Sequence, residues 1–565
     1  MERVTADQVY QVLINVESTD ESQRKPAEEQ LKQWETTSTK GFLASLTEII
    51  AKGTEVHEQV RLLACIVAKN AVGSSWRKTL STREWTKVDQ DEKIFLRNAL
   101  PEVLLKEPNN QVALQIALFL SNIVRFDFPK EWPDILDLLV KTVVEDPSVD
   151  VKYRGVIALK FIFEALQTKV TLTAGFSTEA VQSAVKEARD MPRKVAEQFG
   201  PLANQCKLQL QEFAKATATW QSNATLAIEL LAVLENSIIL VPDLELLEPS
   251  LLGFFETILE CSKAQFQLLL KPFDPQYQQY YNLLSKCFFR NINCVLSTFE
   301  KHTMKFCSYL MPFLRHYTEV LATFPRSSCF FVHRKVMKIT RYLTMVMVCP
   351  FFRHQFWDSI SAMLGSVETK FEKAKIVYGE LNQFLSPECL AALVESLIQN
   401  HLQMTPEEIE AWQNEPEAYL KDAEAPDSIH AYAEELLSAM FLRASGQIRA
   451  ILTNDARKLQ EHQNADSDEI VLLLDGCYRA IGVSRTGSDQ VVDINKWYET
   501  ELRSRIENPQ QCTLFRDRVL LTRGLWLIRR FAARVSADNV DRIISSVLGC
   551  ISSPDLVVSM QAIMT

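Results

Sequence analysis

Glycine is scarce in this sequence: only 15 of its 565 residues are glycine, well below the usual frequency of about 7%. Tight β-turns and phosphate-binding loops depend on glycine, whereas helical hairpins need little of it. Long stretches are instead rich in Leu, Ala, Glu, Gln and Lys. The scarcity of glycine therefore predicts an all-α protein.

The spacing of glycine and histidine excludes several catalytic motifs. No two glycines are closer than five residues, so G-x-G-x-x-G and G-x-S-x-G do not occur, and Ser488 follows Gly487 where a phosphate-binding loop has lysine. No two of the eight histidines are closer than fourteen residues, which rules out H-E-x-x-H. We therefore expect no catalytic residues, no metal site and no cofactor, and a protein that is not an enzyme.

Paired cysteine motifs are also missing, although the chain has twelve cysteines. Cys287 and Cys294 are seven residues apart on a predicted helix, a spacing that favours a shared buried face over metal ligation. Free thiols within apolar segments are typical of a reducing compartment.

Two further signals are lacking. The first twenty residues have no basic region followed by an apolar one, and no run approaches the roughly 18 apolar residues of a membrane span. The net charge of −10 predicts a surface that repels phosphate backbones and attracts basic partners. We expect a soluble intracellular protein that neither binds nucleic acid nor inserts into a membrane.

What the sequence does contain is helical periodicity. In "RKPAEEQLKQWET" (24–36), the apolar residues Ala27, Leu31 and Trp34 lie on one helix face, and Pro26 is expected in the first turn. A helix this short is marginal alone. Trp34 is therefore expected to pack on the next helices, against residues such as Phe42, Leu46 or Val60.

Similar segments follow at 91–106, 109–126, 133–144 and 149–168. One helix pair recurs about every 40 to 50 residues, the period of HEAT repeats. The predicted fold is a right-handed HEAT-repeat α-solenoid, a superhelix of antiparallel helix pairs. Longer helices are expected between 170 and 218, with kinks or breaks at Pro192 and at Gly200-Pro201.

Two charged segments are candidates for binding. Residues 405–428 carry eight carboxylates and one lysine, which predicts a long, mainly exposed connection: either a solvated loop or a docking surface for a basic partner. In "TLFRDRVLLTRGLWLIRRFAARV", Arg516, Arg523, Arg530 and Arg534 lie opposite the apolar stripe. This arginine column could bind an acidic cargo, with Arg516, Arg523 and Arg530 as contacts, or pair with carboxylates of a neighbouring repeat.

Three segments near the start resemble the amino-terminal domain of the importin-beta (karyopherin-beta) nuclear transport receptors. They are "RKPAEEQLKQWE", "GFLASLTEII" and "VRLLACIVAKNAVGSSW", and "FPKEWPDILDLL" (128–139) is similar to a later segment of that family. The matching positions are Ala27, Glu28, Leu31, Arg61, Ala64, Lys69, Asn70 and Trp76.

Within this family, "MTPEEIEAWQNEPEAY", "DINKWYETEL", "LWLIRRF" and "SSPDLVVSMQAIMT" look most like the importin-eleven subgroup. The resemblance implies an importin amino-terminal domain with the first two HEAT repeats at 1–105. HEAT repeats follow at 106–400, with longer helices near 174–218, then an acidic connection at 401–430. Further HEAT repeats are expected at 431–565, where the chain is expected to be cut within a repeat.

The resemblance also implies a function. Such receptors carry protein cargo through the nuclear pore, contact Phe-Gly nucleoporins, and release cargo when the GTP form of the small GTPase Ran binds the amino-terminal repeats. Lys69 matches a position that faces Ran, whereas Arg61 and Asn70 are expected to be structural. We expect shuttling between nucleus and cytoplasm, with a basic cargo as one option. An exportin of the same fold and a static HEAT scaffold remain as alternatives.

Overall fold

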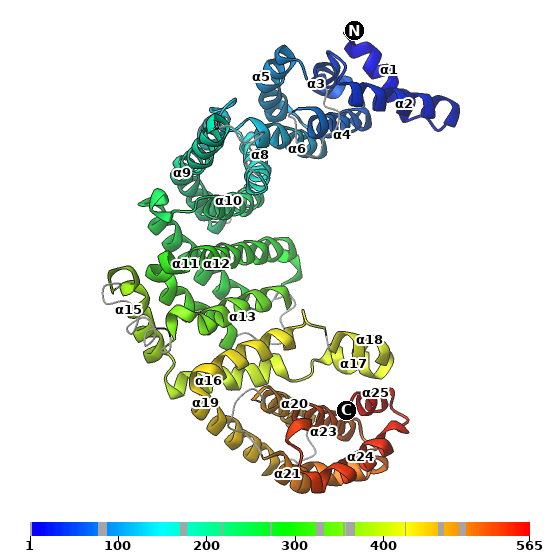
Figure 1. Ribbon diagram of the computed structural model, residues 1–565, viewed down its shortest axis with the longest axis vertical. Coiled ribbons are helices and arrows are strands. Elements are labelled where there is room, and N and C mark those ends of the chain that lie inside the picture. Colours follow the sequence, from blue (N-terminus) through cyan, green and yellow to red (C-terminus); the bar gives the residue numbers. More distant parts are fainter. Residues whose placement is uncertain are drawn as a thin grey trace. The chain divides into compact units, whose positions relative to one another are not determined.

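Figure 1 shows a computed structural model of the chain in which every regular element is a helix within the described residues. These are all residues except 1–2, 77–87, 170–177, 216–217, 272–273, 324–332, 354–355, 357–367, 424, 462–467 and 485–492. The all-α fold predicted from the sequence is confirmed. The chain divides into two compact units, Met1–Thr303 and Met304–Thr565. The predicted boundaries at 105, 400 and 430 stay predictions.

The first unit is a series of helices joined by short connections. In chain order they are α1 (Ala6–Val16), α2 (Glu21–Thr37), α3 (Phe42–Ala51), α4 (Glu58–Ser75), α5 (Gln90–Lys106), α6 (Asn110–Asp127), α7 (Ile135–Glu145), α8 (Val149–Gln167), α9 (Thr178–Ala214), α10 (Trp220–Leu240), α11 (Ser250–Leu269) and the first part of α12 (Gln278–Thr323).

These helices form two layers. In one layer α4 contacts α6, α6 contacts α8 and α8 contacts α10; in the other, α3 contacts α5, α7 contacts α9 and α9 contacts α11. Polar contacts join neighbours within the first layer, as where Lys160 Nζ lies 2.8 Å from Glu229 Oε2. Each helix pair therefore packs mainly on the pairs adjacent in sequence, as in a helical-repeat protein.

The segment at the start of the chain folds largely as predicted. The Trp34 ring lies 5.7 Å from the Phe42 ring between centroids, which confirms the predicted contact. The position of Pro26 is a correction, because α2 begins at Glu21 rather than next to the proline. The carboxylate of Asp20 accepts the Ser22 N–H at 2.9 Å, so this aspartate caps the helix one turn earlier than expected.

The long helices correct part of one expectation and the whole of another. α9 continues through Pro192 and Pro201, so neither proline breaks it, and a kink at either position stays a prediction. α10 is long and apolar enough to cross a membrane by length and composition, contrary to the expectation that no run approached this limit. However, 67% of that apolar window is buried inside the protein, where α10 packs against α8 and α9. Its apolar character therefore matches a core helix.

The second unit contains the remainder of α12, whose backbone departs from helical geometry at His302, and a further series of helices. These are α13 (His333–Val348), α15 (Glu368–Phe384), α16 (Pro387–Leu397), α17 (Pro406–Asn414), α18 (Pro416–Ala423), α19 (Ile429–Glu461), α20 (Asp468–Val483), α21 (Ile494–Trp497), α22 (Arg503–Glu507), α23 (Phe515–Phe531), α24 (Ala537–Ile551) and α25 (Leu556–Met564). Short π-helical segments follow α16 and α21.

In the second unit, α19 contacts α13, α16 and α20, α20 contacts α23, and α23 contacts α25. The approach of α20 to α23 depends on Gly482, since a Cβ at this position would overlap the ring of Trp526. The two helices can therefore lie close together with a large aromatic side chain between them.

Candidate interaction sites

Lys69 lies on α4 and is half-buried. The Nδ2 of Asn122, on α6, lies 3.5 Å from the Lys69 carbonyl oxygen, so α6 contacts the backbone of Lys69. Ile66, one turn earlier, is 40% exposed, and Asn70 is exposed, whereas Val60 is buried. The helical face that Lys69 shares with Ile66 therefore reaches solvent, which the sequence alone did not decide.

Arg61, on the same helix, has a structural position. It is buried, its Nη1 lies 2.5 Å from Glu107 Oε2, and its Nε donates to the Val56 carbonyl at 3.3 Å. Arg61 therefore ties α4 to the end of α5, as the sequence led us to expect. Asn70 was expected to be structural as well, but its side chain is exposed.

Buried carboxylates hold the neighbouring helices in place. Asp127 accepts hydrogen bonds at 2.9 Å from both the Trp76 indole N–H and Arg97 Nε. Glu92 of α5 accepts the Ala44 N–H at the start of α3 at 2.8 Å, and burial raises the pKa of this glutamate. These contacts give the Lys69 surface a rigid support.

The arginine column is directed mainly inward. Arg523 is only 7% exposed, and its Nε lies 2.7 Å from Asp475 Oδ1 of α20. Arg530 Nη2 lies 3.0 Å from Glu434 Oε2 of α19, and Arg516 is half-buried at the start of α23. As a correction, Arg523 is not available to an acidic cargo, because its guanidinium is buried against a carboxylate of a neighbouring helix. Arg523 and Arg530 instead form ion pairs with carboxylates of neighbouring helices, which was the second of the two alternatives predicted for the arginine column.

The acidic segment at 401–430 also differs from the predicted exposed connection. Most of it folds into a helical hairpin, α17 and α18, in which Trp412 and Tyr419 are buried. The Trp412 ring lies 5.4 Å from the Phe515 ring of α23 between centroids. The hairpin is thus anchored by its aromatic residues. Exposed carboxylates lie along the hairpin and in the turn that follows it: Glu407, Glu410, Glu415, Glu417, Asp422 and Asp427.

Sequence reasoning missed a buried charged cluster behind this hairpin. His430 Nε2 lies 2.7 Å from Glu408 Oε1, and His430 Nδ1 lies 2.7 Å from the His401 carbonyl oxygen. Burial alone would raise the pKa of Glu408, but the hydrogen bond from His430, the charge of His430 when it is protonated, and Arg479 lower it to about 2. Burial and Arg479 in turn lower the pKa of His430. The available signal was a charged pair, Asp475 and Arg479, within the otherwise apolar "VLLLDGCYRAIGV".

The eleven described cysteines are all free thiols, and nine of them are buried. Burial raises the pKa of Cys65, Cys287 and Cys477 to about 12. Cys287 and Cys294 share the buried side of α12, as their spacing predicted. Within the described part of the chain, no three His, Cys, Asp or Glu side chains come together in a group that could hold a metal ion.

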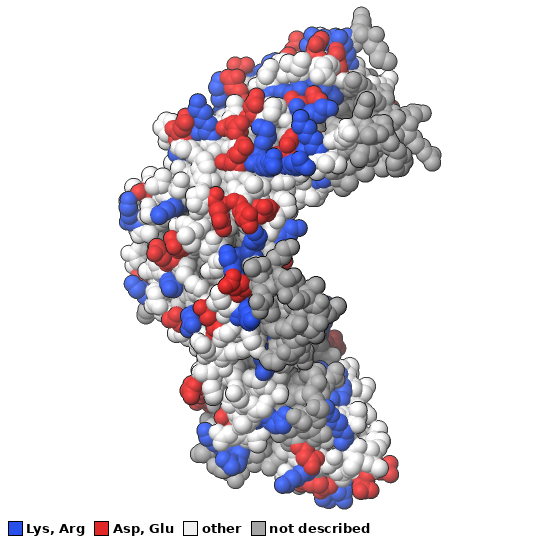
Figure 2. Space-filling model, turned by 60° about the vertical axis from the view of Figure 1, so that its left-hand side comes forward, with Lys and Arg blue, Asp and Glu red and all other residues white. Residues whose placement is uncertain are grey.

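Charged residues on the face drawn in Figure 2 are interspersed, with Lys and Arg lying beside Asp and Glu. This face shows no extended area of one sign among the residues that are coloured there. A broad electrostatic contact with a uniformly charged polymer is not what such a face favours.

Comparisons with known proteins agree with the helical-repeat architecture. Residues 27–106 match the family described as Importin-beta N-terminal domain. Over 567 residues the chain is 23% identical to Importin-11 of Mus musculus, covering 99% of this chain and 54% of that protein. It is 26% identical over 515 residues to Importin beta-like protein KAP120 of Saccharomyces cerevisiae, covering 84% of this chain and 44% of the relative. The chain thus spans about half the length of the curated relatives it matches.

Among solved structures, the fold is similar to that of Lph2, described as a novel bidirectional nuclear transport receptor in S. cerevisiae. The TM-score is 0.71 at 20% identity, and the match covers 98% of this chain and 52% of the other. This agreement confirms the helical-repeat solenoid predicted from the sequence.

Proposed function

We propose that this chain, which belongs to the importin-beta family and is similar to importin-11, acts in a nuclear transport receptor. Such a receptor carries protein cargo through the nuclear pore and is found in both nucleus and cytoplasm. The supporting observation is that the similarity to importin-11 extends over 99% of the chain rather than over its first helices alone. Binding without catalysis is the proposed activity.

The GTP form of Ran is the proposed regulator, with its contact on the first unit near Lys69. The Lys69 side chain shares a solvent-reaching face with Ile66 and Asn70. Buried ion pairs and hydrogen bonds hold α4 and α5 behind this face. A cation on a surface that is supported by buried contacts suits recognition of an acidic patch on a folded partner.

Cargo and nucleoporins are the other proposed partners. The exposed carboxylates of the α17–α18 hairpin favour a basic cargo segment, because opposite charges steer association. Arg516, half-buried on α23, stays a candidate contact for cargo. Phe-Gly nucleoporins are proposed from family membership, with no residues assigned to them.

Transport direction has two candidate answers. Similarity to importin-11 favours import, in which Ran-GTP releases cargo. The similarity in fold to Lph2, described as bidirectional, keeps export as a second candidate, in which cargo and Ran-GTP bind together. A static scaffold would bind neither Ran nor Phe-Gly repeats.

The deciding experiment is a pull-down of the full chain with Ran loaded with GTP or GDP, and separately with an immobilised Phe-Gly peptide. We expect selective binding of the GTP form and binding to the peptide. Equal binding of both Ran forms, together with no retention by the peptide, would contradict the carrier function.

Lys69→Glu tests the proposed Ran contact. We expect Ran-GTP affinity to fall by about tenfold or more, because a charge reversal in an interface replaces attraction with repulsion. Lys207→Glu, a matched reversal at an exposed lysine on α9 of the same unit, should leave the affinity unchanged. Equal affinities of the Lys69→Glu protein and the parent would remove Lys69 from the interface.

A further inference from the structure

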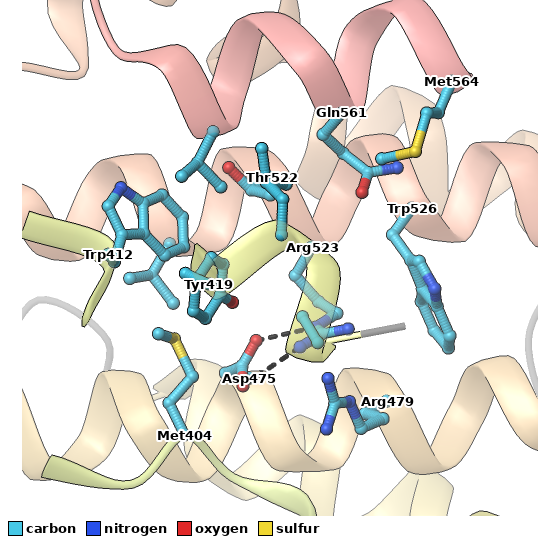
Figure 3. Close-up of a pocket in the computed structure, with 14 residues that line it drawn as sticks. Met404, Trp412, Tyr419, Asp475, Arg479, Thr522, Arg523, Trp526, Gln561 and Met564 are labelled. Atoms are coloured by element: carbon cyan, nitrogen blue, oxygen red, sulfur yellow. Dashed lines mark hydrogen bonds and ion pairs between the residues drawn. The ribbon is translucent and has the colours of Figure 1, made fainter. Parts of the chain in front are cut away.

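A cavity of about 50 Å³ lies in the second unit between the α17–α18 hairpin and helices α20, α23 and α25. Figure 3 shows aromatic and sulfur-containing side chains on its walls, with the charged residues Asp475, Arg479 and Arg523 together on one side. Its rim includes Leu420 and Ala423 of α18, which are partly exposed. The cavity can therefore be reached from solvent. One water requires roughly 10 to 15 Å³ by a comparable measure, so this space suits a group of a few heavy atoms.

Arg479 is the unusual member of this cavity. The side chain is 6% exposed, and its Nε and Nη1 have no hydrogen-bond partner within the described part of the chain. Its nearest ion pair is long, with Nε 3.6 Å from Glu434 Oε1, and Glu434 also binds Arg530 at 3.0 Å. Buried charged donors are normally satisfied, because leaving them unpaired costs free energy.

Arg523, in contrast, has hydrogen-bond partners for its buried guanidinium. Its Nε and Nη2 lie 2.7 and 3.4 Å from the two oxygens of Asp475, so each group in that pair has its partner. The charged residues that line the cavity are therefore two arginines and one aspartate. Arg479 also faces Glu434 and Glu408, which do not line the cavity, so what it offers the cavity is unpartnered N–H donors rather than a surplus charge.

A second unpartnered polar atom lies on the same cavity. The Oγ1 of Thr522 is buried and has no hydrogen-bond partner among described residues. Trp412, Tyr419 and Trp526 supply apolar surface around it, and the Trp526 ring is flanked by Arg523 and Arg530, whose guanidinium carbons lie 5.0 and 4.8 Å from its centroid. The cavity thus offers guanidinium and hydroxyl donors beside apolar walls.

We propose that this cavity is a binding site for a single carboxylate group of a partner protein, with Arg479 as the charged contact and Thr522 as a hydroxyl donor. A carboxylate matches the volume and the unpartnered guanidinium and hydroxyl donors, whereas a doubly charged phosphate would be repelled more strongly by Asp475 on the same wall. The carboxylate could belong to a Glu or Asp side chain or to a chain terminus. The site would exist whether or not the protein carries cargo.

The test uses the full chain and four small probes in saturation-transfer NMR and calorimetry: N-acetyl-glutamate amide, N-acetyl-glutamine amide, N-acetyl-alanine and N-acetyl-alanine amide. We expect saturable binding of a carboxylate probe and at least tenfold weaker binding of its neutral counterpart. Tighter binding of the glutamate probe assigns the site to side chains, and tighter binding of N-acetyl-alanine assigns it to chain termini. Equal binding of charged and neutral probes, or no saturable binding up to tens of millimolar, would overturn the proposal and leave a cavity that holds water only.

Arg479→Met should weaken carboxylate binding at least tenfold, while Arg542→Met, at a partly exposed arginine of α24, should not. Two milder variants keep the test decisive where Arg479→Met fails to fold. Thr522→Val removes only the hydroxyl, and Ala423→Phe blocks the rim without altering any charge. Unchanged carboxylate binding by both folded variants would also overturn the proposal.

Discussion

The indole N–H of Trp412 lies 3.1 Å from Oδ2 of Asp555, a carboxylate 143 residues further along the chain. Asp555 also accepts the Val557 N–H at 3.0 Å, which caps α25, and Arg518 Nη1 lies 2.8 Å from it. One carboxylate thus joins the acidic hairpin, α23 and the start of α25.

Asp555→Ala should therefore cost more stability than Trp412→Phe. Trp412→Phe removes one hydrogen bond and some buried area, which we expect to lower the free energy of unfolding by about 1 to 2 kcal/mol. Asp555→Ala removes the cap and the ion pair as well, for a loss of about 2 to 4 kcal/mol. Urea unfolding of the full chain measures both values. Equal losses would show that the cap and Arg518 contribute nothing beyond the Trp412 contact.

The buried pair of Arg61 and Glu107 gives a second prediction. Arg61→Met leaves the Glu107 carboxylate buried without its counter-ion, and we expect a loss of about 3 to 5 kcal/mol. Adding Glu107→Leu should restore most of that stability, because two apolar side chains replace two buried charges. Thermal unfolding of the parent, single and double variants checks this. A double variant no more stable than Arg61→Met would contradict the buried-charge explanation.

Gly482→Ala tests the close approach of α20 and α23. The added methyl group overlaps the Trp526 ring, so we expect a loss of about 1 to 3 kcal/mol and a changed tryptophan emission spectrum. Gly549→Ala is the matched control, since a Cβ there meets no atom within 4 Å. Because Gly549 lies inside α24, this control should raise stability by up to about 1 kcal/mol. If Gly549→Ala lowered stability more than Gly482→Ala, the proposed overlap between a side chain at position 482 and Trp526 would be refuted.

The lowered pKa of Glu408 predicts that the stability of the protein depends on pH. Its pKa is about 2 in the folded protein against an ordinary value of 4.5, so the unfolded chain binds the proton more tightly. Its contribution to stability is complete above about pH 5 and is lost as the pH falls toward 2. The carboxylate is 26% exposed, so we expect the parent to exceed Glu408→Gln by about 1 to 2 kcal/mol at pH 7.

This difference should shrink by about 0.5 to 1 kcal/mol at pH 4. Chemical unfolding of both proteins at pH 7, 5 and 4 measures it. A difference that stays constant over this range would mean that Glu408 titrates normally.

Periodicity predicted the helices well where each one packs on its neighbour in sequence. The expected segments at 91–106, 109–126, 133–144 and 149–168 correspond closely to α5, α6, α7 and α8. The contact of Trp34 with Phe42 was accessible for the same reason, because it joins successive helices. Such contacts depend on local spacing, which a sequence displays directly.

Contacts between distant segments were not accessible in this way. The acidic composition of 405–428 masked two aromatic anchors, and the partner of Trp412 lies 143 residues away. A helical wheel likewise placed Arg523 opposite the apolar stripe, but could not show that Asp475 of another helix lies there. A helical wheel gives the side of the helix on which a side chain lies, but it does not show which residues of other helices that side chain contacts.

The burial of the cysteines has a practical consequence for labelling. A thiol reacts with maleimides as the thiolate, and burial that raises the pKa of Cys65, Cys287 and Cys477 to about 12 leaves almost none of that form at neutral pH. Cys261 and Cys389, which are only half-buried, and Cys329, which lies outside the described residues, can be replaced by serine. A single cysteine introduced on an exposed helix face would then take up a fluorophore selectively, without removal of the buried thiols that fill the helical core.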